Sequence, residues 1–298
     1  MRILVIKHGA LGDVVLAFPA FSAIRAAWPD AEISLLTTAP FAGFLAASPW
    51  FNQVAVDTRP EWWNVSGLLK LRQQLRGFGL VYDLQTSGRS SRYFALAGRP
   101  EWSGIAKGCS LPHGNPRRER MHSRERLADQ LAMAGIADVP APDLAWADAD
   151  VLGFRLPKRF AVLVPGAAPH RPAKRWPEEK FAALAPQLRM PVVVLGSADD
   201  AELARPIRKV APNAIDLTGK TSLTQLAAVI RRASLAVGND TGPMHMAAAF
   251  GIPSVVLFSG ESDPALTAPR YADGGWPKIL RAPHLSGLPV AQVVAALP

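Results

Sequence analysis

Residues 2–38 carry the sequence RILVIKHGALGDVVLAFPAFSAIRAAWPDAEISLLTT. Its two ends, 2–7 and 32–38, are short runs rich in Val, Ile and Leu, which is typical of buried strands. The residues between them are apolar at helical spacing, namely Val14, Ala17, Phe18, Phe21, Ile24 and Trp28. Asp13 is placed to cap this helix, and Pro19 should bend it. A strand, a helix and a second strand in this order predict a βαβ unit and a parallel sheet.

The same alternation continues along the whole chain. Further strands are predicted at 53–58, 80–86, 160–166, 192–196, 214–219, 235–240 and 254–260. Helices are predicted at 178–189, 199–210, 222–233 and 242–250, with a terminal helix within 285–298. This pattern predicts an α/β protein.

The length favours two domains, because 298 residues exceed the usual size of a single core of about 100–200 residues. The stretch PAPDLAWADADVLGFRLP, 140–157, interrupts both periodicities and is the best candidate for a linker. We therefore expect one domain at 1–150 and another at 151–298. Two open α/β domains joined in this way should place a cleft between the carboxyl ends of their sheets, where ligands bind.

The composition limits the cellular setting. Hydrophobic residues make up 49% of the chain, yet no window approaches the roughly 20 apolar residues of a membrane span. The first apolar run is too short for a signal peptide, and the single cysteine, Cys109, fits a reducing compartment. We expect a cytoplasmic protein.

The charge balance favours an anionic partner. The chain has 33 Lys and Arg against 24 Asp and Glu, a net charge of +9, which suits phosphate, nucleic acid or an acidic membrane surface. Nucleic acid is disfavoured because basic and aromatic residues do not interleave as in single-strand binders. The densest basic cluster is interpreted as a solvated loop, and consists of Arg117, Arg118, Arg120, Arg124 and Arg126.

The first candidate site is HGALGD, residues 8–13, which follows the first strand and opens the first helix. Gly9 and Gly12 allow a tight turn and a close approach of backbone to a ligand. The stretch is not a dinucleotide fingerprint, and no acidic residue follows the second strand, so a nicotinamide enzyme is disfavoured. The plain alternative for Asp13 is an ordinary helix N-cap.

The second candidate site is GNDTGPMHMAAA, residues 238–249, at another junction of strand and helix. Asp240 or Thr241 can cap the helix, and Pro243 suits its first turn. The amides of Thr241 and Gly242 would then face a diphosphate at the positive end of the helix dipole. His245 lies on the same turn; its plain alternative is a satisfied core histidine.

The third candidate site is PGAAPHRPAKRWPEEKF, residues 165–181, which follows the first strand of the second half. Lys174 lies just before a helix start marked by Trp-Pro-Glu-Glu, and its ammonium suits a phosphate. The plain alternative is a surface lysine in a basic loop. All three sites lie at the carboxyl ends of predicted strands, so they would line one cleft.

These stretches resemble glycosyltransferase family 9, the heptosyltransferases of the bacterial lipopolysaccharide inner core. The resemblance covers nearly the whole chain, through ILVIKHGALGDVVLAFPAFSAIR, YDLQTSGRSSRYFALAG, PGAAPHRPAKRWPEEKF and LTGKTSLTQLAAVIRRASLAVGNDTGPMHMAAAFGIPSVVLF. It implies the GT-B architecture, with two facing Rossmann-like domains, the first for the acceptor and the second for the donor. It also implies transfer of heptose from ADP-heptose with inversion, without a metal and with no cofactor.

Several site residues follow from this resemblance. Asp13 matches the catalytic base, Lys174 the phosphate-binding lysine and Asp240 an acidic group near the donor sugar. Thr241 and Gly242 match the backbone phosphate cradle, and His245 the histidine of that motif.

The resemblance also extends to the donor ribose and to the acceptor. Asp199 or Asp200 would meet the ribose, and Gly12 would admit the donor closely. On the acceptor side the matching residues are Gln85, Ser87 and Arg89, to which Arg59 is added from its position beside two tryptophans. The loop upstream of Lys174 departs from the family, because Ala167, Ala168, Pro169 and His170 stand where some members have a hydroxyl residue.

The resemblance implies ADP-heptose or a related nucleotide sugar as one partner, and an anionic lipopolysaccharide precursor on the inner face of the inner membrane as the other. A transferase for another nucleotide sugar and a non-catalytic nucleotide-sugar-binding protein are the alternatives. A metal-dependent transferase would need a DxD motif, which Asp148-Ala149-Asp150 supplies formally, but in the linker. The histidines and the cysteine show no metal-ligand spacing.

Overall fold

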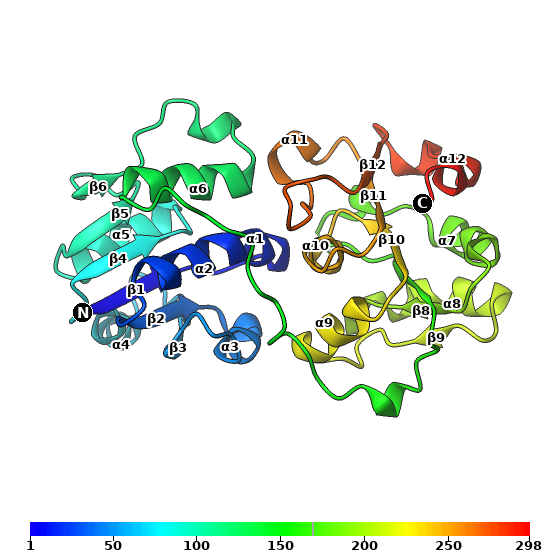
Figure 1. The fold of residues 1–298 in the computed structure, drawn as a ribbon, viewed down its shortest axis with the longest axis horizontal. Helices are drawn as coiled ribbons and strands as arrows, with labels where there is room; N and C mark the ends of the chain where they lie inside the picture. Colours follow the sequence, from blue (N-terminus) through cyan, green and yellow to red (C-terminus); the bar gives the residue numbers. More distant parts are fainter. Residues whose placement is uncertain (169) are drawn as a thin grey trace. The chain divides into compact units, whose positions relative to one another are not determined.

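The computed structural model describes residues 1–168 and 170–298. The chain forms two compact units, Met1–Trp146 and Ala147–Pro298 (Figure 1). Each unit contains one six-stranded sheet, ordered β3-β2-β1-β4-β5-β6 in the first unit and β12-β11-β10-β7-β8-β9 in the second. The predicted α/β class with parallel sheets is confirmed, since the paired strands run parallel throughout.

The first unit follows the predicted alternation of strand and helix. Its strands are β1 Arg2–Ile6, β2 Glu32–Thr37, β3 Gln53–Val56, β4 Leu80–Asp83, β5 Glu101–Gly104 and β6 Leu111–Pro112. Its helices are α1 Leu11–Leu16, α2 Phe18–Ala27, α3 Ala39–Ala46, α4 Val65–Leu75, α5 Gly88–Leu96 and α6 Ser123–Met133, with a 3₁₀ turn, η1, at Arg118–Arg120. β5 and β6 were not predicted, because they are short and lack a run of branched apolar residues.

The first helix is broken rather than continuous. α1 ends at Leu16 and α2 begins at Phe18, with Pro19 in the first turn of α2. Proline has no N–H to donate to the preceding turn, so the helix stops and restarts around Ala17. This confirms the predicted bend. Phe18 then packs on Trp50, with ring centroids 5.2 Å apart.

The second unit also follows the predicted order. Its strands are β7 Ala161–Val164, β8 Val192–Val194, β9 Ile215–Asp216, β10 Leu235–Asn239, β11 Ser254–Phe258 and β12 Lys278–Arg281. Its helices are α7 Glu178–Leu184, α8 Ala201–Val210, α9 Leu223–Arg231, α10 Gly242–Ala249, α11 Pro264–Thr267 and α12 Val290–Ala295. Short 3₁₀ turns complete it: η2 Leu152–Phe154, η3 Pro172–Lys174, η4 Ala185–Leu188, η5 Ala198–Asp200 and η6 Leu285–Gly287. β12 and α11 were not predicted.

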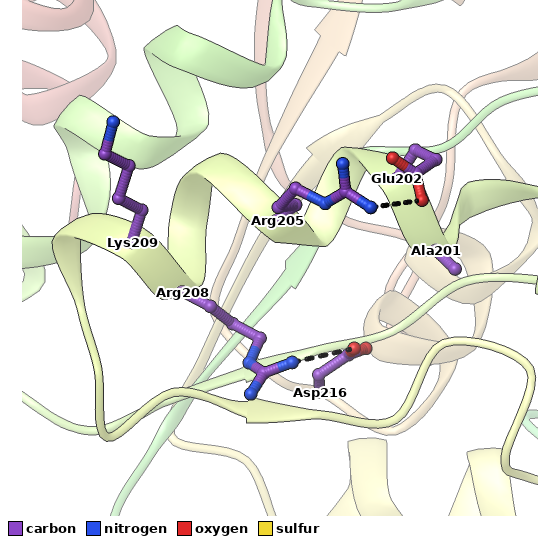
Figure 2. Close-up of a pocket in the computed structure, with 6 residues that line it drawn as sticks. All are labelled: Ala201, Glu202, Arg205, Arg208, Lys209 and Asp216. Atoms are coloured by element: carbon purple, nitrogen blue, oxygen red, sulfur yellow. Dashed lines mark hydrogen bonds and ion pairs between the residues drawn. The ribbon is translucent and has the colours of Figure 1, made fainter.

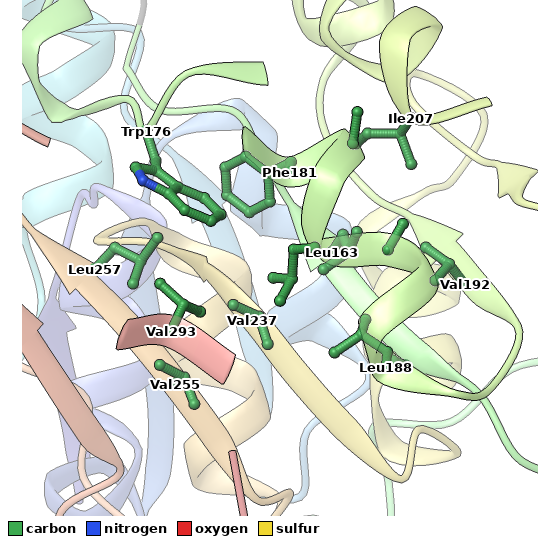
Figure 3. Close-up of a cluster of buried hydrophobic side chains, with 14 of the residues drawn as sticks. Leu163, Trp176, Phe181, Leu188, Val192, Ile207, Val237, Val255, Leu257 and Val293 are labelled. Atoms are coloured by element: carbon green, nitrogen blue, oxygen red, sulfur yellow. The ribbon is translucent and has the colours of Figure 1, made fainter. Parts of the chain in front are cut away.

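The core of the second unit fixes the loop that leads into α7. Figure 3 shows strand residues such as Val237 and Leu257 packed with Trp176 and Phe181. Trp176 is 1% exposed, and its indole N–H donates to the carbonyl of Leu288 at 3.0 Å. The end of the third candidate site is therefore anchored in the hydrophobic core.

Among the described residues, no helix is long and apolar enough to cross a bilayer.

Candidate functional site

Asp13 lies in the first turn of α1, but not at the position expected. The N-cap is Ala10 and Asp13 is the third residue of the helix, so the predicted N-cap role is wrong. Alanine has no side-chain oxygen for a cap; the Asp13 Oδ2 instead accepts from the Ala10 N–H at 3.1 Å, as in half of a capping box. Within residues 1–168 and 170–298, the other carboxylate oxygen, Oδ1, has no hydrogen-bond partner and is available to a ligand.

Asp13 interacts electrostatically with two cations, Lys7 and Arg126, and sequence reasoning missed both interactions. Lys7, the residue after β1, is 8% exposed and donates to the Leu84 carbonyl at 3.4 Å. Burial lowers the pKa of Lys7, while the charge of Asp13 raises it and that of Arg126 lowers it further. A lysine closing an apolar strand was the available signal.

Part of the basic cluster near Arg118 is built into the fold. The Arg118 side chain is only 12% exposed, donating to the Thr86 hydroxyl at 2.9 Å and to His113 Nδ1 at 3.2 Å. Arg126 is 29% exposed in its side chain, and burial together with the charge of Arg118 lowers its pKa. The solvated-loop interpretation is therefore wrong for these two arginines, and for Arg118 the contact with Thr86 joins segments 32 residues apart.

Gln85 and Ser87 follow β4 and have different partners. Gln85 Oε1 accepts from the His8 N–H at 2.9 Å, which joins the end of β4 to the first candidate site. The Ser87 hydroxyl accepts from the Ser90 N–H at 3.1 Å and caps α5.

The two predicted acceptor-side arginines differ in their setting. Arg89 donates to the Pro60 carbonyl at 3.1 Å and lies over the Trp62 ring at 5.0 Å. Arg59 has an exposed side chain, and its backbone N–H donates to an Asp57 carboxylate oxygen at 2.7 Å.

Asp83 is the last residue of β4 and is fully buried. Its Oδ1 accepts from the amides of Gln85 at 3.1 Å and Thr86 at 3.0 Å, whereas its Oδ2 has no partner in the part of the chain that the structure describes. Burial raises the pKa of Asp83 to about 6, against opposing hydrogen bonds led by that from Thr86. The native fold therefore binds this proton more tightly than the unfolded chain does.

We expect Asp83→Asn to stabilise the protein at pH 7 by about 1–3 kcal/mol, because the amide keeps the Oδ1 contacts without a buried charge. Wild-type stability should fall as the pH rises from about 4 to 6, where the native carboxyl loses its proton. The stability difference between Asp83→Asn and wild type should vanish near pH 3.5. Urea unfolding across this pH range measures the difference, with Asp143→Asn, at an exposed position, as the control. A variant less stable than wild type at pH 7 would contradict it.

In the second unit, α10 begins as expected. Thr241 is the N-cap, so of the two candidate caps Asp240 is excluded, and Gly242 opens the helix with Pro243 next. Neither the Thr241 nor the Gly242 amide has a hydrogen-bond partner within residues 1–168 and 170–298. Free amides at the positive end of a helix dipole form a site for an anion.

Lys174 ends the turn η3 and contacts the strand end that precedes α10. Its Nζ lies 2.5 Å from Asp240 Oδ2, which also accepts from the Ser262 hydroxyl at 2.8 Å. The Lys174 side chain is 12% exposed, so it is not a plain surface lysine. His245 Nε2 lies 3.8 Å from Asp240 Oδ1, an electrostatic contact longer than a hydrogen bond.

The pKa of Asp240 falls to about 2, since its contacts outweigh burial. Burial alone would raise it, while His245 and Lys174 lower it. Asp240 is therefore charged at neutral pH, next to a cation. His245 is itself 5% exposed, and its Nδ1 has no partner among the described residues.

Asn239 joins the second and third candidate sites, a role that the sequence did not reveal. This last residue of β10 is fully buried. Its Oδ1 accepts from the Trp176 N–H at 2.9 Å, and its Nδ2 donates to the Pro165 carbonyl at 2.7 Å. One amide thus fixes both ends of the loop that carries Lys174, beside Asp240.

We expect Asn239→Leu to destabilise the protein by about 2–4 kcal/mol, because a buried N–H and a buried carbonyl lose their partners. Displacement of Lys174 should also weaken the binding of an anion at the start of α10. Chemical denaturation and titration with inorganic pyrophosphate measure the two effects. Asn213→Leu, at an exposed position of the same unit, should have neither effect. Equal losses in the two variants would contradict the role of Asn239 in fixing the loop.

The two candidate ribose carboxylates have different environments. Asp200 is 6% exposed, accepts from the Ser197 N–H at 2.9 Å, and pairs with Arg175 at 3.5 Å. A Cβ on Gly166 would lie 2.4 Å from its carboxylate, so glycine is required there. Asp199 is exposed. Of the pair, Asp199 is the one free to meet a ligand.

The formal DxD motif serves the fold. Both carboxylate oxygens of Asp148 accept from the Arg232 guanidinium, at 2.6 and 3.2 Å, and this hydrogen bond lowers the pKa of Asp148. Over the described residues, no group of three or more His, Cys, Asp or Glu could hold a metal ion.

Comparison with known families decides the class of protein. The model described as glycosyltransferase family 9 (heptosyltransferase) matches residues 68–274. The chain belongs to glycosyltransferase family 9. It is therefore a glycosyltransferase, as the resemblance predicted.

Curated relatives match this family 9 glycosyltransferase over most of its length. Lipopolysaccharide heptosyltransferase 2 of Escherichia coli K12 is 29% identical, covering 90% of this chain and 85% of the relative. Lipooligosaccharide heptosyltransferase 2 of Haemophilus ducreyi is 28% identical, covering 96% and 93%.

Solved structures confirm the GT-B fold class. The E. coli structure described as ADP-heptose lps heptosyltransferase II has a TM-score of 0.77 at 24% identity, covering 99% of this chain and 97% of that one. The family 9 transferase of Veillonella parvula has a TM-score of 0.81 at 22% identity, covering 99% and 95%.

The family 9 transferase also has a surface pocket of about 500 Å³ along α8 and β9 that contains none of the predicted site residues. Figure 2 shows two ion pairs in this pocket, one between Arg205 and Glu202 and the other between Arg208 and Asp216. Both arginines are thus already paired with neighbouring carboxylates.

Proposed function

We propose that this glycosyltransferase moves a heptose from ADP-heptose to an inner-core lipopolysaccharide acceptor, with inversion at the anomeric carbon. The observation that carries the proposal is the buried pair of Lys174 and Asp240, beside the open amides that begin α10. The names of its relatives, lipopolysaccharide heptosyltransferases, agree with it. Two solved structures of one relative, an E. coli heptosyltransferase, are described with ADP and with ADP-2-deoxy-2-fluoro heptose.

In this proposal the second unit binds the donor. The amides of Thr241 and Gly242 and the ammonium of Lys174 would hold the diphosphate and stabilise its charge as it leaves. Asp240, held in place by Lys174 and Ser262, would accept from sugar hydroxyls. His245 would donate to the donor, and Asp199 would meet the ribose.

The first unit binds the acceptor, with Asp13 as the general base. The acceptor O–H gives its proton to Asp13 Oδ1, while its oxygen bonds to the anomeric carbon and the bond from that carbon to the diphosphate oxygen breaks. A single displacement inverts the configuration. Gln85, through its bond to the His8 amide, orients the loop that carries Asp13, while Ser87, Arg89 and Arg59 are the other proposed acceptor contacts.

We further propose that the reaction needs no metal or cofactor. The acceptor carries phosphate and acidic sugars, so the net charge of +9 would favour a cytoplasmic enzyme held at the inner face of the membrane.

A panel of nucleotide sugars, incubated with truncated lipopolysaccharide acceptors and followed by mass spectrometry, tests the proposal. We expect a mass gain of one heptose with ADP-heptose, unchanged by EDTA. Transfer from another nucleotide sugar would show that ADP-heptose is not the donor. ADP binding without any transfer would favour a nucleotide-sugar-binding protein, and activity lost in EDTA and restored by Mn²⁺ would overturn the metal-free step.

A further inference from the structure

Helix α4 and the turn before it present large apolar side chains to solvent. Trp63 is 79% exposed, Val65 67% and Leu69 53%. Val65 and Leu69 are four residues apart, so they lie on the same side of the helix, next to Trp63 at its start. The opposite side packs inward through the buried Leu71 and Leu75. Exposed apolar residues gathered in this way mark an interaction surface.

Cations continue the same surface. Arg72 and Arg76 follow Val65 and Leu69 at helical spacing, and Lys70 and Arg59 are exposed beside them. None of these four cations has a carboxylate within ion-pair distance in the described part of the chain. Residues 59–76 contain one acidic residue, Glu61. The surface is therefore positive as well as apolar.

The basic helix α8 differs in this respect. Arg205 pairs with Glu202 at 3.0 Å, and Arg208 lies 4.0 Å from Asp216. These two arginines are compensated within the fold, whereas Arg72 and Arg76 are not compensated within the described residues. Arg205 and Arg208 therefore provide an internal control for charge that is already paired.

We propose that Trp63, Val65, Leu69, Arg72 and Arg76, named here the α4 face, bind an anionic lipid bilayer. A membrane-surface helix combines aromatic and aliphatic residues that enter the headgroup region with Lys and Arg that meet anionic lipids. A protein partner would also cover the apolar residues, but the uncompensated cations favour a surface dense in negative charge.

The α4 face adjoins the predicted acceptor segment. The guanidinium groups of Arg89 and Arg92 lie 5.0 and 5.1 Å from the centroid of the Trp62 ring, and Arg89 donates to the carbonyl of Pro60. The turn that carries Trp63 is thus fixed to the first half of α5. This inference rests on the proposed function for its purpose, since the face would place the acceptor segment next to a lipid-anchored acceptor.

Co-sedimentation of the full chain with vesicles tests the α4 face. We expect binding to phosphatidylcholine vesicles that contain phosphatidylglycerol, weakened by salt, and little binding to phosphatidylcholine alone. Arg72→Gln with Arg76→Gln should weaken binding about 25-fold, from about fivefold per charge. Trp63→Ser with Leu69→Ser should weaken it at least about tenfold. The matched pair Arg205→Gln with Arg208→Gln, which removes the same charge from α8, should weaken it less than about threefold.

Three outcomes would overturn the proposal: no binding to anionic vesicles, equal binding to neutral ones, or equal losses from the α4 and α8 pairs. A dimer that Trp63→Ser with Leu69→Ser abolishes, seen by analytical ultracentrifugation, would assign the face to a second copy instead.

Circular dichroism and thermal unfolding check that each variant is folded. Transfer to a water-soluble acceptor should persist in the Arg72 and Arg76 pair. Vesicle binding without heptose transfer would refute the proposed function alone.

Discussion

Asp13→Asn is expected to lower turnover by about 10²–10⁴-fold, the usual contribution of a general base. The amide oxygen can still accept from the Ala10 N–H, so the start of α1 should be preserved. What is lost is the proton acceptor at Oδ1, the oxygen that has no partner in the described residues. Initial rates with saturating donor and acceptor measure the effect.

The accompanying measurements separate chemistry from structure. Thermal unfolding and ADP binding of Asp13→Asn should match wild type, because the donor is assigned to the other unit. Asp30→Asn, which makes the same change at an exposed position of the first unit, should leave turnover within about twofold. Full turnover in Asp13→Asn would remove Asp13 from the mechanism.

Lys174→Ala is expected to affect both activity and stability. Loss of a preorganised cation at a leaving diphosphate should cost about 10²–10³-fold in turnover. The change also leaves Asp240 as a buried charge without its cation, which destabilises a fold by about 3–5 kcal/mol. Urea unfolding and steady-state kinetics measure the two effects.

The depressed pKa of Asp240 gives the pair a pH dependence with a definite sign. In the wild type the pKa of Asp240 is depressed to about 2 from an ordinary 3.8. The pair therefore stabilises the fold fully above about pH 4, and this contribution disappears as the pH falls towards 2. Lys174→Ala should lose much of that acid-side slope.

A second substitution distinguishes stability from catalysis. Adding Asp240→Asn to Lys174→Ala should restore part of the stability, because no buried charge remains, but not the turnover. Lys220→Ala, at an exposed surface lysine of the same unit, should change stability by less than about 0.5 kcal/mol. Recovery of turnover in the double variant would contradict the role of Lys174.

The fold was largely predictable because most of the buried parallel strands contain a run of apolar residues. β1 and β10 are examples, and both carry candidate sites at their carboxyl ends. Strands without such a run, β5 as EWSG and β12 as KILR, were missed. These two short strands form because neighbouring strands pair with them, which the local sequence does not show.

The candidate site was less predictable, since its contacts join distant residues. Asp13 was placed near the helix start but assigned the wrong position, because the sequence does not show that the helix begins at Leu11 with Ala10 as its N-cap. Asn239 stood inside a motif that was noticed, yet its bond to Trp176 spans 63 residues. Lys7 and Arg118 depend in the same way on tertiary packing.

The amide of Asn239 also sets a rule for engineering donor preference by recombination. A chimera whose crossover falls between Trp176 and Asn239 takes the lysine loop from one parent and the strand end from another. The hydrogen bonds to the Trp176 N–H and the Pro165 carbonyl form only if the second parent has an asparagine at position 239. The loop and the strand end therefore have to come from the same parent. A chimera that takes residues 165–176 from a parent without also taking residue 239 should fold poorly.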